Sequence, residues 1–214
     1  MIHNILPGII GQLQSTGGCS PIQSLTFNAN AGTSNLSYAP VYGLYDYGMS
    51  MFLINQSELG SGEKQLTSIS FEAAGFTSPY TVNNQRIQLA HTTATDLTTS
   101  IQILTTGDLS TPATFTGVNN SDLQEVKTPF TWVIGSTGWQ TPITFDNTFC
   151  YNGVDNLLII WENRDGTWVS GYGWWESWFS NTNTETWYKY QDTTFPTGYG
   201  TTNVSYRPNI RLGY

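Results

Sequence analysis

The chain has 214 residues, 14% of them aromatic and only 10% charged, and it carries a formal net charge of −8. This length suits one all-β domain with an arm and is enough to bury a substantial core. The seven basic residues are scattered along the whole sequence, so the pattern excludes nucleic acid and anionic membranes as partners.

The first 37 residues predict an extended N-terminal arm. Small and polar residues dominate after Ile10, so this segment has little to contribute to a hydrophobic core. An ordered segment of this composition needs a surface to lie on. We therefore expect residues 1–37 to dock on a neighbouring subunit or on the domain that residues 38–214 form. The arm lacks the pattern of a secretory signal, and no apolar stretch of the chain reaches the roughly 18 residues of a membrane span.

Short segments in which apolar and polar residues alternate follow the arm and predict strands. Residues 39–59 predict one or two strands that end in a helical turn at residues 57–59. The other predicted strands before the centre of the fold are residues 66–71, 85–91, 100–104, 113–118, 123–126 and 130–134.

The sequence also predicts one loop between these strands and the direction of two side chains. Residues 75–84 contain a proline and an Asn-Asn pair, which predict a loop. In residues 85–91 the alternation directs Ile87 and Leu89 toward the core.

Residues 138–161 predict the centre of the fold, as two strands joined by a turn. The apolar residues at odd positions of the first strand are Trp139, Ile143, Phe145 and Phe149. Polar residues lie between them, which is typical of a strand with one buried and one wet face. Asn152-Gly153 predicts the turn of a hairpin. Residues 157–161 form a run of large apolar side chains and predict a central strand covered on both faces.

The last quarter of the chain continues the same pattern. After a turn at residues 163–166, strands are predicted in residues 168–179, 186–190, 204–206 and 207–212. Many short strands without a helical segment of any length predict an all-β fold, an antiparallel β-sandwich of jelly-roll type with an extended N-terminal arm.

The most aromatic stretch offers a candidate interface or glycan platform at Tyr172, Trp174, Trp175 and Trp178. Adjacent Trp174 and Trp175 point to opposite faces of a strand, so at most one of them enters the core. Exposed Trp and Tyr are enriched at protein interfaces, and their rings stack on sugars. Core packing, a subunit interface and a glycan platform are all open as interpretations of this stretch.

The side chains that most often carry catalysis are not arranged for it. His91 ends a predicted strand, and no Ser/His/Asp pattern or G-x-S-x-G motif accompanies it. We expect His91 to bond to backbone groups. The sequence therefore predicts a protein that is not an enzyme, with no catalytic residue and no cofactor.

Four carboxylates and two cysteines complete the inventory of reactive groups. The carboxylates near the centre of the fold are Asp146, Asp155, Glu162 and Asp165. Turn chemistry is the interpretation that we prefer for them, and a calcium site or glycoside hydrolysis are the alternatives. Cys19 and Cys150 lie far apart, so two separate thiols are the interpretation that we prefer, and a disulfide between them is the alternative. No Cys/His spacing of a metal site occurs, and we predict no bound metal.

Four segments share their order and spacing with one known family. They are residues 40–59 (PVYGLYDYGMSMFLINQSEL), residues 69–93, which end in NNQRIQLAHTT, residues 138–161, and the final RPNIRL. These segments resemble the cleaved-adhesin-like, jelly-roll domain of Bacteroidetes surface proteins and their phages, over residues 39–212. The resemblance implies a β-sandwich and carries over no catalytic residues.

The resemblance also implies a role at a surface. The chain lacks the secretion signal, the sorting domain and the protease that accompany bacterial members of the family, so it looks more like a phage virion component. We expect a non-enzymatic virion structural protein, such as a capsid decoration protein, head fibre or tail fibre, held by other virion proteins and by copies of itself. The alternative is a carbohydrate- or cell-surface-binding adhesin module outside the cell.

Overall fold

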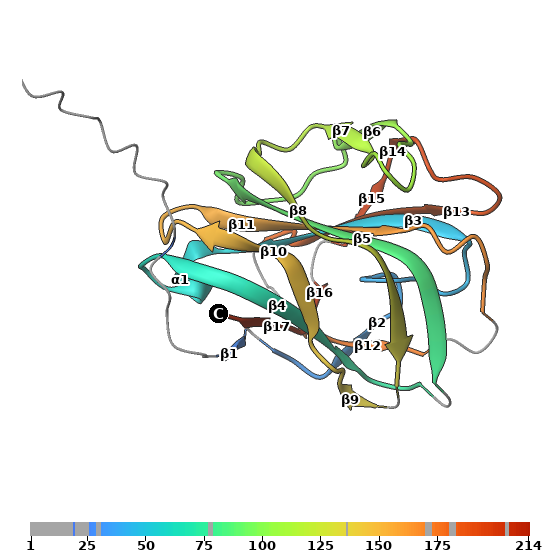
Figure 1. The fold of residues 1–214 in the computed structure, drawn as a ribbon, viewed down its shortest axis with the longest axis horizontal. Helices are drawn as coiled ribbons and strands as arrows, with labels where there is room; N and C mark the ends of the chain where they lie inside the picture. The colour runs from blue at the N-terminus through green and yellow to red at the C-terminus, as the bar shows by residue number, and fades with distance from the viewer. Residues whose placement is uncertain are drawn as a thin grey trace, which may run out of the picture.

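The computed structural model describes residues 19, 26–28, 31–76, 79–135, 137–169, 173–179, 183–203 and 206–214. The strands of these residues form three antiparallel sheets, and Figure 1 shows the two larger ones packed face to face. The chain is an all-β sandwich, which confirms the fold class that the alternating segments predicted. Among the described residues, no helix has the length and apolar character that crossing a membrane requires.

The elements are distributed as follows. The first sheet contains β1 (Thr26–Asn28), β2 (Ser34–Leu36), β4 (Lys64–Ala73), β9 (Gly138–Trp139), β10 (Ile143–Tyr151), β12 (Trp175–Phe179), β16 (Tyr206–Pro208) and β17 (Ile210–Gly213). The second sheet contains β3 (Tyr47–Ile54), β5 (Tyr80–Thr92), β8 (Ser121–Ile134), β11 (Asn156–Asn163), β13 (Thr186–Gln191) and β15 (Thr201–Asn203). The third sheet contains β6 (Gln102–Thr105), β7 (Thr114–Thr116) and β14 (Gly198–Tyr199), and together with residues 93–120 it is called the cap below. The helix α1 (Gln56–Leu59) follows β3, which confirms the helical turn predicted at residues 57–59.

Apolar side chains pack on both faces of the second sheet. Leu157, Ile159 and Trp161 of β11 belong to the core between the two large sheets, while Leu158 and Ile160 belong to a core beneath the cap. Figure 1 shows this layering, with the cap on the face of the second sheet opposite the first. β11 pairs with β3 on one side and β5 on the other. The prediction of a central strand covered on both faces is confirmed.

The two strands on either side of Asn152-Gly153 do not form a hairpin. β10 pairs with β4 in the first sheet, whereas β11 lies in the second. The turn therefore carries the chain from one sheet to the other, and the predicted hairpin is wrong. The chain changes sheets in the same way between β3 and β4 and between β4 and β5, which is the winding that a jelly roll makes.

Two predicted breaks lie inside long strands. The loop predicted at residues 75–84 ends early, because β5 begins at Tyr80 and absorbs the Asn-Asn pair as a bulge with Asn84 at φ +54°. The strands predicted at residues 123–126 and 130–134 are one strand, β8, which contains Pro129. Among the described strands β8 pairs only with β5, so its edge position and its bulges accommodate the proline.

The described parts of the predicted arm contact the domain. β1 pairs with β17 and β2 pairs with β12. Cys19 forms a disulfide with Cys150 of β10, and their Cα atoms are 5.5 Å apart. The expectation of two separate thiols is wrong, because the separation of 131 residues in sequence says nothing about the distance after folding. Residues 1–18, 20–25, 29 and 30 of the arm lie outside the described part, and docking on a neighbouring subunit stays a prediction.

Candidate functional site

The predicted aromatic platform divides between the interior and the surface. Trp175 is fully buried, stacks on Trp132 with 5.2 Å between ring centroids and donates its indole N–H to the carbonyl of Val41. Trp174, which lies just before β12, is 45% exposed, so only Trp175 of the two neighbours enters the core, as the sequence predicts. Trp178 is half-buried, and Tyr172 lies outside the described residues. A platform role for these residues stays a prediction.

A second aromatic group lies where the segment before β3 meets β13. Tyr188 and Tyr190 are two residues apart on β13 and therefore share a face of the sheet, with their rings parallel and 5.5 Å apart. Tyr38 stacks on Tyr188 with 4.8 Å between ring centroids. Tyr42 and Tyr45 pack against Tyr190 at 4.8 and 4.4 Å. These five residues are called the tyrosine cluster.

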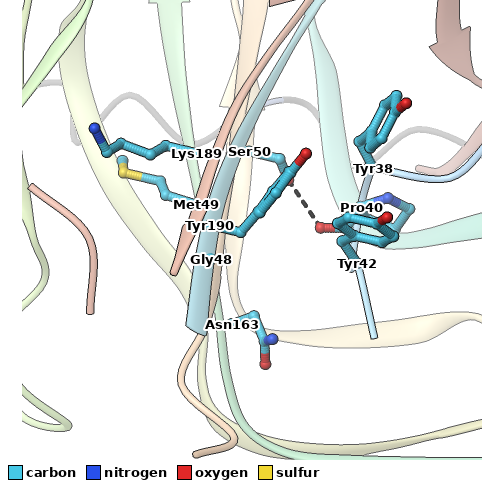
Figure 2. A pocket seen from close by; sticks show the side chains of 9 residues that line it. All are labelled: Tyr38, Pro40, Tyr42, Gly48, Met49, Ser50, Asn163, Lys189 and Tyr190. Carbon is cyan, nitrogen blue, oxygen red and sulfur yellow. Dashed lines mark hydrogen bonds between the residues drawn. The ribbon is translucent and has the colours of Figure 1, made fainter. Parts of the chain in front are cut away.

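Several contacts hold the tyrosine cluster in place. Every ring of the cluster is half-buried, and each close ring pair adds roughly 0.5–1.5 kcal/mol beyond the area that it buries. The Ser50 hydroxyl of β3 donates to the Pro40 carbonyl at 2.9 Å, a bond drawn in Figure 2. The cluster borders a small cavity of about 10 Å³, which has room for about one water molecule. Figure 2 shows Tyr42 and Tyr190 among the residues that line it. A larger ligand could therefore contact only the outer surface of the cluster.

The phenol groups of the cluster influence one another. Burial raises the pKa of Tyr188 and Tyr190, and neighbouring phenol groups raise it further. Both hydroxyls therefore stay protonated near neutral pH, where each can donate and accept hydrogen bonds. The cluster offers apolar ring surfaces and neutral hydroxyl groups side by side.

Sequence reasoning did not find this cluster. The tyrosines at positions 42 and 45 are visible as a Tyr-rich stretch, and Tyr188 and Tyr190 are visible at strand spacing. The pairing of β13 with β3 brings the two stretches together, and no local pattern encodes that pairing. The available signals were the Tyr-rich stretch and the alternation of Tyr188 and Tyr190 on a strand with a polar residue between them.

His91 is held at both ring nitrogens. Its Nε2 accepts the backbone N–H of Asn152 at 2.9 Å, so Nδ1 carries the proton and donates to Asp122 at 2.7 Å. A His–Asp pair of this kind resembles half of a catalytic triad, but the second nitrogen faces a backbone amide rather than a nucleophile. The expected role of His91, bonding to backbone, is confirmed.

Glu162 of β11 is fully buried at the centre of a charge network. Its Oε2 accepts from Arg86 at 2.9 Å and from Arg164 at 2.6 Å, and its Oε1 accepts the backbone N–H of Ala113 at 2.9 Å. Arg86, which is also buried, donates to the carbonyl of Leu109 at 2.8 Å. The network therefore fastens the cap to the second sheet.

The other three carboxylates have separate structural partners. Asp146 forms an exposed ion pair with Lys127 at 2.5 Å. Asp155 closes the turn after β10, where the Asn152 side chain donates to its carboxylate and accepts its backbone N–H. Asp165 accepts a backbone N–H from the bulge of β5. In the described part of the chain, no group of three or more His, Cys, Asp or Glu side chains is placed to hold a metal ion.

Comparison with known proteins gives no relative for this chain. No family model matches it, and neither the curated proteins nor the solved structures contain a match. Function is therefore argued from the geometry of the chain itself.

Proposed function

We propose that the chain is a non-enzymatic structural protein of a virion surface, a capsid decoration, head-fibre or tail-fibre component that contacts copies of itself and other virion proteins. The observation that supports this proposal most is that buried ionisable groups make structural contacts within the fold. His91 and Glu162, which could have served acid–base chemistry, each join separate segments of the fold. The exposed aromatic side chains, among them Trp174 and Tyr199, offer surface for contacts with partners.

Antibodies against the purified chain test this proposal. We expect them to label intact phage particles from the source of this sequence in electron micrographs. We also expect the chain to be recovered from those particles in fixed stoichiometry and to attach to particles stripped of it. A chain that is found only free of particles would contradict the proposal.

The tyrosine cluster favours a second candidate function, a carbohydrate- or cell-surface-binding module. Tyrosine rings supply a large amphipathic contact area at low conformational cost, and the rings of the cluster are already held by their neighbours. In this case the chain would act at a cell surface or outside the cell. Binding of the purified chain to a glycan array without attachment to particles would favour this function over the first.

A further inference from the structure

A hollow of about 210 Å³ adjoins the tyrosine cluster. Its lining residues are Tyr188, Lys189, Tyr190, Tyr199, Gly200 and Thr201. The hollow has a simple origin in the strand pairing, because β15 follows β13 only as far as the Tyr188–Thr201 pair, while residues 198 and 199 pair with β6 of the cap. The two parts of the chain diverge there, and Figure 1 shows β14 beside β6 and away from β13.

Tyr199 is strongly exposed on a backbone that close contacts hold in place. Its side chain is 62% exposed. Gly198 has φ +86°, and Gly200 lies so close to Trp187 that a Cβ atom would overlap the indole ring. The Lys189 ammonium group donates to the carbonyl of Tyr199 at 2.6 Å. Because this backbone is already fixed, contact of Tyr199 with a ligand costs only the ordering of its side chain.

The chemistry of the lining points to one class of ligand. The exposed ring of Tyr199 offers an apolar face on which the C–H face of a sugar ring can stack, and Tyr188 and Tyr190 also line the hollow. The phenol hydroxyls and the Thr201 hydroxyl can donate to and accept from sugar hydroxyl groups. The described lining includes no carboxylate, the Lys189 ammonium group already binds a carbonyl, and the net charge of −8 disfavours anionic ligands.

We propose that this hollow binds a neutral oligosaccharide, with the exposed ring of Tyr199 stacked on a sugar unit and the tyrosine cluster extending the contact surface. The inference rests on the second proposed function and assigns its binding site.

Calorimetric titration of the full chain tests this proposal. The probes are neutral hexasaccharides of glucose, mannose, xylose and N-acetylglucosamine, with a hyaluronan hexasaccharide as the anionic counterpart. We expect at least one neutral probe to bind more tightly than hyaluronan. Tyr199→Ala should weaken that binding about tenfold, and Tyr199→Phe, which keeps the ring, should weaken it less than about threefold. Equal unfolding midpoints would show that the variants are folded.

Trp168→Ala is the matched control, because Trp168 is also a large exposed aromatic residue and does not line the hollow. This variant should bind as the unaltered chain does. Trp174→Ala tests the rival aromatic platform beside β12, and loss of binding in that variant but not in Tyr199→Ala would overturn the assigned site and leave the second proposed function standing. Binding by none of the neutral probes would overturn both, and tighter binding of hyaluronan would overturn the ligand class.

Discussion

At the scale of single residues, burial decides what each charged group does. Glu162 and Asp146 are both carboxylates in ion pairs, yet the Glu162 side chain is fully buried and the Asp146 side chain is 53% exposed. The sequence presents them as members of one acidic group. The structure gives them different energetics, because a buried charge that loses its partner has no water to replace it.

Glu162→Gln should strongly destabilise the fold. The substitution removes the charge that faces two buried guanidinium groups, those of Arg86 and Arg164. Breaking a buried ion pair from one side typically costs about 3–5 kcal/mol. We expect a loss of this size in the free energy of unfolding from urea denaturation. Amide hydrogens of the cap should lose exchange protection in the same variant, because the network holds the cap.

Asp146→Asn is the control for this prediction. Its ion pair with Lys127 is exposed, and pairs of this kind contribute about 0–1 kcal/mol. The free energy of unfolding should therefore hardly change. Equal losses in the two variants would show that burial of Glu162 does not set the energetics of the network.

A second residue-scale prediction concerns Glu185, which shares Arg207 with Glu58. Arg207 lies 3.4 Å from Glu185 and makes two shorter contacts with Glu58, at 2.9 and 2.7 Å. Burial raises the pKa of Glu185, and the Glu58 charge raises it further, while Arg207 lowers it. An acid with a raised pKa in the folded state favours folding at low pH, so its contribution is complete below the ordinary Glu pKa of about 4.3 and is lost as the pH rises through the raised value.

Comparison of stability at several pH values tests this assignment. Between about pH 4 and pH 7, the unaltered chain should lose more stability than Glu185→Gln does. The free energy of unfolding from urea denaturation at each pH gives the difference between the two chains. Parallel pH profiles would show that Glu185 titrates in the folded chain as it does in the unfolded one.

At the scale of elements, local sequence patterns predicted well where the strands lie but poorly which strands pair with each other. The run at residues 157–161 and the alternation at residues 143–149 come from the side chains themselves, because a strand buried on two faces or on one face requires them. Sheet membership depends on contacts between distant segments. The hairpin signal of Asn152-Gly153 was therefore read correctly as a turn and wrongly as a pairing of β10 with β11.

The candidate site likewise has features that a local pattern predicts and features that depend on the pairing of distant strands. That one of Trp174 and Trp175 would be exposed followed from strand geometry alone. The tyrosine cluster and the hollow beside Tyr199 require β13 to lie next to β3 and β15, a long-range pairing that no motif announces. Surface aromatic sites of this kind are set by topology, so a single sequence gives their residues and not their assembly.

The turn between β10 and β11 supports a prediction at this scale. Gly153 has φ +74°, and a Cβ atom on it would lie 2.5 Å from backbone atoms of Gly62. Gly153→Ala should therefore incur both the cost of a left-handed residue, roughly 1–2 kcal/mol, and the cost of overpacking, roughly 1–3 kcal/mol. Urea denaturation measures the sum.

Gly62→Ala separates the two costs. Gly62 has φ +91°, but a Cβ atom on it would meet nothing within 4 Å. This variant should show only the conformational cost, so it should lose less stability than Gly153→Ala. If both variants lose the same amount, the close contact between the two backbone segments does not contribute.

At the scale of the whole molecule, the second sheet is the layer on which the others are assembled. The first sheet covers one of its faces and the cap covers the other. The N-terminal segment adds to the first sheet through β1 and β2, and a disulfide links it to β10. The disulfide thereby joins two residues that are 131 positions apart in the sequence, so the loop that it closes contains most of the domain.

The Cys19–Cys150 disulfide should contribute strongly to global stability. It closes a loop of 131 residues, and in the chain-entropy account a loop of about that size stabilises the folded state by roughly 5 kcal/mol through its effect on the unfolded chain. We expect a reducing agent to lower the free energy of unfolding by an amount approaching this value. Urea denaturation with and without the reducing agent gives the measurement.

Cys19→Ser provides the decisive comparison. This variant should already unfold at the lower urea concentration of the reduced chain, and the reducing agent should change it no further, because the bond is its only target in the described part of the chain. β1 and β2 should keep their pairing in the variant, since each is bonded to a strand of the domain independently of Cys19. Full loss of folding in Cys19→Ser would mean that the tether is needed to form the first sheet. Unchanged stability would mean that the two sulfur atoms are not joined in solution.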